Sequence, residues 1–135
     1  MENNLATSLT QFGIRTMNDH QREQATRFNV NVVPINQPSV DIELKFSEPV
    51  YISIDLDGLD PAYAPGVSHP EPGGLSTREI INFISNIKGD IIGADIVEYN
   101  PYRDINEITA ITAAKLLKEI TVSYTHLTLP TTLVV

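Results

Sequence analysis

The hydrophobic positions of the chain repeat with two spacings, one typical of strands and one typical of helices. Every second residue from Val50 to Leu56 is aliphatic, which predicts a strand with one buried face. Similar patterns predict further strands at 9–14, 30–35 and 91–97, and helices at 19–28, 77–88 and around 113–120. Strands that alternate with helices are typical of an α/β domain with a mostly parallel sheet.

Two loops separate these elements. Residues 36–49 are punctuated by proline, and residues 58–74 contain four glycines and four prolines, too many for a helix or a central strand. Directly after the second loop, Ser76 and Glu79 have the spacing of a capping box, which marks the start of the helix expected at 77–88.

Acidic side chains stand at the carboxyl ends of two expected strands. Asp55 and Asp57 are placed on the face opposite the aliphatic residues, and Glu98 follows the strand at 91–97. Ligands of open α/β sheets bind beyond the carboxyl ends of strands, so we expect these three acids to meet at one edge. Neighbouring carboxylates are costly without a cation, and oxygen ligands favour Mg²⁺, Mn²⁺ or Ca²⁺. The alternative is that Asp55 and Asp57 only cap the next loop.

Composition narrows the class of protein. The 135 residues are enough for one domain, and no apolar run approaches the ~20 residues of a membrane span, so we expect no membrane partner. Nine basic and 17 acidic residues give a net charge of −8, which argues against a nucleic-acid partner. The chain has no cysteine, so any metal must be held by oxygen and imidazole ligands. Without an export signal in the first twenty residues, we expect a cytoplasmic protein.

A longer pattern surrounds the acids. Its parts are Ser-Ile-Asp-Leu-Asp-Gly-Leu-Asp-Pro at 53–61, Ala-Pro-Gly at 64–66, Glu-Pro-Gly-Gly-Leu at 71–75 and Gly-Ala-Asp-Ile-Val-Glu-Tyr-Asn-Pro at 93–101. This pattern resembles the signature of the ureohydrolase family, the arginases and agmatinases. The resemblance reaches back to Phe-Gly-Ile-Arg at 12–15 and covers about residues 10–120. It implies a three-layer α/β/α fold, arginase-like, and hydrolysis of a small guanidino substrate, agmatine or arginine, to release urea.

The resemblance also implies roles for single residues. Two Mn²⁺ ions would activate a bridging hydroxide, with Asp55 bridging both ions and Asp57 binding one. Glu98 would accept hydrogen bonds from the substrate guanidinium. His69 stands where many relatives carry threonine, and as a catalytic candidate it would touch the substrate or shuttle a proton. The alternative for His69 is a loop histidine that faces solvent.

The family's remaining four ligands come from motifs of the Gly-Gly-Asp-His and Asp-Ala-His-x-Asp type, which this sequence lacks. Those motifs normally precede the part present here, so residues 1–120 are expected to be the C-terminal part of a ureohydrolase domain, truncated at the N-terminus and homo-oligomeric when complete. Residues 121–135 form a tail of doubtful origin that resembles translated adapter or vector sequence, with a C-terminal strand as the alternative.

Two other functions stay open at this point. The chain alone is expected to be inactive, and an inert or oligomerising remnant is therefore an alternative to an enzyme. The Asp-Leu-Asp-Gly sequence at 55–58 also resembles the first motif of haloacid-dehalogenase-type phosphatases. The Leu-Asp-Pro at 59–61 and the proline-rich loop that follow do not fit that family.

Overall fold

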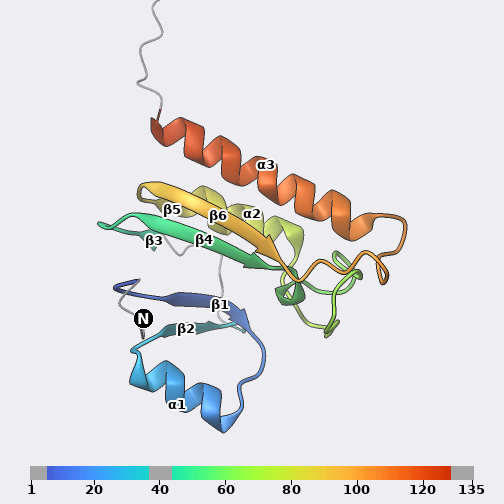
Figure 1. Cartoon of the computed structure of the whole chain (residues 1–135), viewed down its shortest axis with the longest axis horizontal. Helices are drawn as coiled ribbons and strands as arrows, with labels where there is room; N and C mark the ends of the chain where they lie inside the picture. The colour runs from blue at the N-terminus through green and yellow to red at the C-terminus, as the bar shows by residue number, and fades with distance from the viewer. Residues whose placement is uncertain (1–5, 37–43, 129–135) are drawn as a thin grey trace, which may run out of the picture.

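The computed structural model describes residues 6–36 and 44–128, with side chains of the last helix described as far as Tyr124. Strands and helices alternate along the chain (Figure 1). The elements are β1 (Thr10–Ile14), α1 (Asp19–Arg27), β2 (Asn31–Pro34), β3 (Leu44–Lys45), β4 (Val50–Asp55), the 3-10 turn η1 (Leu56–Gly58), α2 (Thr77–Asn86), β5 (Ile87–Lys88), β6 (Ile91–Val97) and α3 (Ile108–Thr128).

All strand pairs among the described residues are parallel, which agrees with the α/β prediction. The pairs are β1 with β2, β3 with β5, and β4 with β6, so the described residues form three two-stranded sheets rather than one continuous sheet. Helix α1 connects the first pair and α2 lies between β4 and β6 along the chain, as parallel pairing requires a crossover. No helix of the described part is long and apolar enough to cross a membrane.

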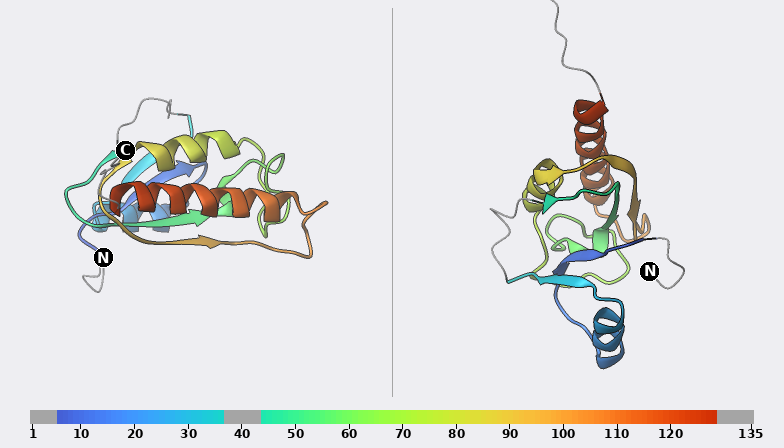
Figure 2. Two further views of the ribbon diagram at one scale, coloured as in Figure 1. Left: turned by 90° about the horizontal axis from the view of Figure 1, so that it is seen from above. Right: turned by 90° about the vertical axis from the view of Figure 1, so that its left-hand side faces the viewer.

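The core lies between the β4–β6 pair and two helices. In Figure 1 and in the left view of Figure 2, α2 and α3 lie side by side over the same face of this pair. Of the residues that alternation predicted to be buried, Ile54 of β4 is 6% exposed, Leu56 of η1 is fully buried, and Ile52 packs against them partly buried. Leu116 and Ile120 of α3 complete the same cluster. Helix packing on one face leaves the opposite face of β4, with Ser53 and Asp55, exposed.

The capping box of α2 forms as expected, with the Glu79 N–H donating to Ser76 Oγ at 3.2 Å and the Ser76 N–H to Glu79 Oε2 at 2.7 Å. The helix ends at Asn86, two residues before the expected end, because Ile87–Lys88 pair with Leu44–Lys45 as strands β5 and β3. Strand β3 lies within the segment predicted to be a loop, whose residues 37–43 are outside the described residues.

Helix α3 is longer at both ends than the stripe around 113–120 predicted. It begins at Ile108, where the Asp104 carboxylate accepts hydrogen bonds from the N–H groups of Thr109 and Ala110 at 2.9 and 3.0 Å. It continues to Thr128, so the alternative of a strand in this part of the tail is wrong. Neither glycine nor proline occurs between Ile108 and Thr128, and the first helix breaker is Pro130. The suspected origin of residues 121–135 stays a prediction.

Candidate functional site

Strand β4 ends at Asp55, one residue earlier than expected, and the chain turns at once into η1. Asp55 Oδ1 accepts a hydrogen bond from the Asp57 N–H at 2.8 Å and so caps this turn. Asp57 is therefore oriented by the turn and not by the pleat of the strand. Capping occupies one oxygen of the Asp55 carboxylate, and its second oxygen keeps its acceptor capacity.

Asp55 is exposed as a whole residue, but partial burial of its carboxyl raises the pKa of that group. The hydrogen bond from Asp57 N–H opposes this, and the Asp57 carboxylate raises the pKa again by repulsion. The positive charge of Arg15 lowers it by a smaller amount. An acid whose charged form is penalised by burial and by a neighbouring acid gains the most from a nearby cation.

Asp57, His69 and Glu98 meet at the ends of β4 and β6. Each offers one ligand atom, a carboxylate oxygen or an imidazole nitrogen, and these atoms all lie within 4.8 Å of one another. The Asp57 side chain is 19% exposed, whereas that of His69 is 86% exposed. His69 Nδ1 lies 3.3 Å from Asp57 Oδ2, and the His69 N–H donates to Asp57 Oδ1 at 3.3 Å. Two carboxylates and an imidazole form a donor set that suits a hard or borderline divalent cation.

Asp55 is not part of this three-residue group. In the β4–β6 register it pairs with Val97, so the chain reaches Glu98 one residue beyond the paired position. Of the sequence-predicted site residues, the structure thus clusters three and leaves the fourth beside them, close enough to Asp57 for the two carboxylates to repel each other.

Glu98 has an unusual backbone conformation, with a φ of 66° in the left-handed region that favours glycine. Such strain costs about 1–3 kcal/mol and is concentrated at functional sites. The strain occurs where β6 ends and the chain turns toward the 58–74 loop, to which it is tied by a hydrogen bond from the Asn100 N–H to Gly66 O at 2.8 Å. The left-handed backbone of Glu98 thus occurs at the residue whose carboxylate lies near Asp57 and His69.

The loop that carries His69 is closed at its base. The Leu75 N–H donates to Gly58 O at 3.0 Å, and the Asp60 N–H donates to Leu75 O at 2.9 Å. The Asp60 carboxylate accepts the N–H groups of Ala62 and Gly73 at 2.9 and 2.7 Å, and these bonds lower its pKa. A Cβ on Gly74 would lie 2.4 Å from Asp60 N, so the close approach of the two loop ends requires glycine there.

Sequence reasoning missed one charged residue of this region, Arg15. It was part of the Phe-Gly-Ile-Arg motif but had no role, and in the structure its side chain donates to the main-chain oxygens of Asp57 and Glu71. The motif itself was the only signal, because the two acceptors lie far away in the sequence.

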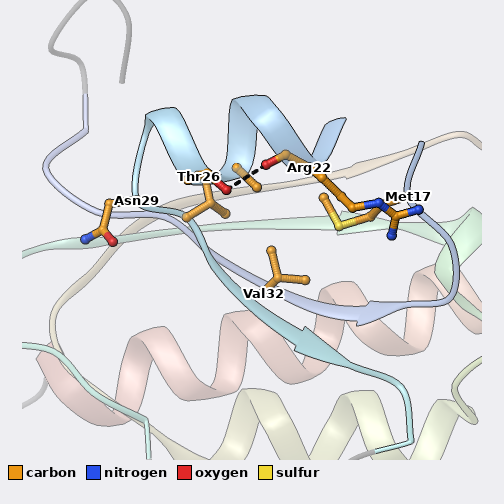
Figure 3. Close-up of a pocket in the computed structure, with 7 residues that line it drawn as sticks. Met17, Arg22, Thr26, Asn29 and Val32 are labelled. Carbon is orange, nitrogen blue, oxygen red and sulfur yellow. Dashed lines mark hydrogen bonds between the residues drawn. The ribbon is translucent and has the colours of Figure 1, made fainter. Parts of the chain in front are cut away.

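A separate hollow of about 530 Å³ lies between α1 and β2 (Figure 3). Its lining residues are Met17, Arg22, Ala25, Thr26, Asn29, Val30 and Val32, which include none of the clustered acids. The hollow is therefore distinct from the site at the ends of β4 and β6.

Comparison with known proteins identifies the family. The sequence model of the Arginase family matches residues 1–123. The chain belongs to the arginase family. The chain is 49% identical over 128 residues to "Arginase 1, mitochondrial" of Arabidopsis thaliana. This match covers 89% of the chain and 37% of that relative. An agmatinase of Bacillus cereus is 34% identical over 114 residues, which is 80% of the chain and 39% of that relative.

Solved structures of the arginase family confirm the fold prediction. Arginase from Medicago truncatula matches with a TM-score of 0.85 and 46% identity over 91% of this chain and 41% of that one. A triple mutant of a T. brucei arginase-like protein, solved bound with Mn²⁺, matches with a TM-score of 0.83 and 29% identity over 91% of this chain and 44% of that one. The family-level resemblance is thus confirmed, and the chain spans less than half the length of the relatives it matches.

The expectation of a cytoplasmic protein is wrong. The similar plant arginases carry the names mitochondrial, as in Oryza sativa, or chloroplastic/mitochondrial, as in a second Arabidopsis thaliana protein, and these names point to an organelle. The expectation relied on the absence of an export signal, which does not distinguish the cytoplasm from an organelle.

Proposed function

We propose that this chain carries part of the active site of a manganese-dependent ureohydrolase, which hydrolyses the guanidino group of arginine and releases urea. The observation that carries the proposal is the convergence of Asp57, His69 and Glu98 in a chain of the arginase family. The match to the Arabidopsis thaliana arginase extends over 128 residues at 49% identity, whereas the match to a Gallus gallus agmatinase, at 50% identity, extends over 72 residues. The longer match favours arginine, and agmatine is the second candidate substrate.

Asp55 and Asp57 would hold the proposed metal. Their anionic oxygens suit Mn²⁺, and the T. brucei relative was solved with this ion bound. When bound, Mn²⁺ supplies Lewis-acid activation of water near neutral pH, with two such ions in the complete enzyme. A cation here also offsets the burial and the repulsion that raise the pKa of the Asp55 carboxyl.

Glu98 is proposed to hold the substrate. Its carboxylate can accept charge-assisted hydrogen bonds from a guanidinium, whose planar N–H groups match the two oxygens of an acid. Because a ligand atom of Glu98 lies within 4.8 Å of one of Asp57, a guanidinium held by Glu98 would lie beside Asp57. Glu98 would thus orient the guanidinium carbon toward the residues proposed to hold the metal.

His69 is proposed as the proton-transfer group. Hydrolysis joins the water oxygen to the guanidinium carbon and breaks the carbon–nitrogen bond to the rest of the substrate, so the leaving amine nitrogen must receive a proton. Imidazole can deliver this proton near neutral pH. The 86% exposure of His69 and its loose 3.3 Å contacts to Asp57 suit a proton shuttle better than a rigid metal ligand.

The experiment that tests this function measures urea release by the complete protein from arginine and from agmatine, with and without Mn²⁺. We expect Mn²⁺-dependent release that is faster with arginine. His69→Asn should lower kcat by about 100-fold, the lower range of general acid–base catalysis, and leave the affinity for Mn²⁺ within about twofold of wild type. His20→Asn, in the exposed first turn of α1, serves as the matched control and should change neither quantity.

Absence of urea release from both substrates would contradict the proposed activity. Equal loss of Mn²⁺ affinity and of kcat in His69→Asn would make His69 a metal ligand instead. The chain belongs to the arginase family, and this membership accounts for the Asp-Leu-Asp-Gly sequence at 55–58. It therefore argues against a haloacid-dehalogenase-type phosphatase.

A further inference from the structure

Arg15 follows strand β1 and ends the Phe-Gly-Ile-Arg motif. The register of β1 shifts between Phe12 and Ile14, and Gly13 within the shift has a φ of 73°, which favours glycine. A Cβ on Gly13 would also lie 2.8 Å from Leu75 Cδ1, so a larger residue would have to displace the Leu75 side chain. This irregular end of β1 leads into Arg15.

The guanidinium of Arg15 bonds to two separate segments of the chain. Nη2 donates to the main-chain oxygen of Asp57, and Nη1 donates to the main-chain oxygen of Glu71. Arg15 Nε also lies 3.8 Å from Glu71 Oε2, and the Arg15 side chain is only 13% exposed. One nearly buried side chain thus joins the η1 turn to the distal part of the 58–74 loop.

These two attachment points flank the Asp57–His69 contact. Asp57 is itself one member of that contact, and Glu71 lies two residues after the other member, His69. On the other side of His69, Arg103 Nη1 donates to Ser68 O at 3.3 Å. The spacing between the Asp57 carboxylate and the His69 ring therefore depends on how these arginines hold the loop.

We propose that Arg15 is a positioning residue for this site, whose forked guanidinium sets the spacing between Asp57 and the loop that carries His69. The inference rests on the proposed function only for the identity of the bound metal, Mn²⁺. The hydrogen bonds of Arg15 to Asp57 and Glu71 are present in the chain whatever the site binds. Planar geometry is essential to it, since two nitrogens in a rigid plane bond two carbonyls at a fixed separation and a lysine ammonium does not.

Charge offers a second explanation for any effect of Arg15. Its positive charge lies close enough to Asp55 and Asp60 to favour their ionised forms. Lysine keeps this charge and loses the fork, so Arg15→Lys separates the two explanations. A charge effect alone would be rescued by lysine, and a positioning effect would not.

The test compares Arg15→Lys with wild type by two measurements. Without metal, amide hydrogen exchange should become about tenfold faster at His69 and Gly73, whose N–H groups donate to Asp57 and Asp60. Exchange in α2 should stay unchanged, because this helix opens independently of the loop. The affinity for Mn²⁺ alone, measured by electron paramagnetic resonance, should fall by about 10- to 100-fold, as for groups that orient metal ligands. Arg22→Lys, a change at an exposed arginine of α1 that pairs with Asp19, is the matched control and should change neither.

The proposal is overturned if Arg15→Lys behaves as wild type in both measurements. Faster exchange throughout α2 as well as in the loop would also overturn it, because Arg15 would then be a general stabilising residue. If wild type itself binds no Mn²⁺ but Arg15→Lys still exchanges faster at His69 and Gly73 alone, the proposed function fails while the positioning role stands.

Discussion

Asp57→Asn is expected to lower kcat/KM for urea release by more than about 100-fold. Mutation of a residue that only supports a metal ligand costs about 10- to 100-fold, and loss of a ligand should cost more. Asparagine keeps the size of the side chain but removes the negative charge and one anionic oxygen. The change affects the residue that contacts His69 and lies within ligand distance of Glu98. We expect a comparable loss of affinity for Mn²⁺, because the neutral amide is a weaker ligand for a hard cation.

The measurement is urea release by the complete protein at saturating Mn²⁺, together with the Mn²⁺ affinity of wild type and variant. Asp90→Asn is the matched control, since Asp90 is an exposed acid between β5 and β6 that contributes its main-chain oxygen to the Val50 N–H. If Asp57→Asn and Asp90→Asn keep equal activity, Asp57 is no ligand and the alternative of a simple loop-capping acid applies.

The second large effect is expected at Glu98, where activity and stability should change in opposite directions. Glu98→Gly removes the carboxylate proposed to hold the guanidinium, and hydrogen bonds to charged groups contribute about 1.5–3 kcal/mol, or roughly 10- to 150-fold in kcat/KM. The same change relieves a backbone at φ 66°, where a side chain costs about 1–2 kcal/mol. We therefore expect lower activity, a higher free energy of unfolding by about 1 kcal/mol, and an unchanged affinity for Mn²⁺.

Glu107→Gly is an instructive control because Glu107 also has a positive φ, 60°, and lies outside the clustered acids. It should raise stability by a similar amount and leave urea release intact. Thermal unfolding and steady-state kinetics of both variants measure the two effects. Full activity in Glu98→Gly would exclude Glu98 from substrate binding, and a large loss of Mn²⁺ affinity would make it a metal ligand.

Local patterns predicted most of the fold. The alternation along β4 and the capping box at Ser76 depend on neighbouring residues, and both the strand and the start of α2 were predicted within one residue. The two-residue strands β3 and β5 were missed because each exists only through pairing with the other, which no local pattern records. The end of α2 was misplaced for the same reason.

The sequence named the residues that cluster at the ends of β4 and β6 as candidates, but it did not predict how they are arranged. Acids at strand ends and the family pattern selected Asp55, Asp57 and Glu98, as well as His69 in the loop. The turn that separates Asp57 from the strand, and the left-handed backbone of Glu98, result from packing and were invisible in the sequence. No local pattern indicates the role of Arg15, because its contact to Glu71 spans 56 residues.

The most direct test of the central claim is the position of Mn²⁺ on this chain, measured by paramagnetic line broadening in nuclear magnetic resonance spectra. At low Mn²⁺ concentration we expect broadening to begin at the amides of Asp57, His69 and Glu98 and to disappear in Asp57→Asn. Asp55 should broaden with them, because its carboxylate is the second proposed ligand. Broadening that begins instead at exposed acids such as Asp19 or Asp90, and that persists in Asp57→Asn, would contradict a metal site at the ends of β4 and β6.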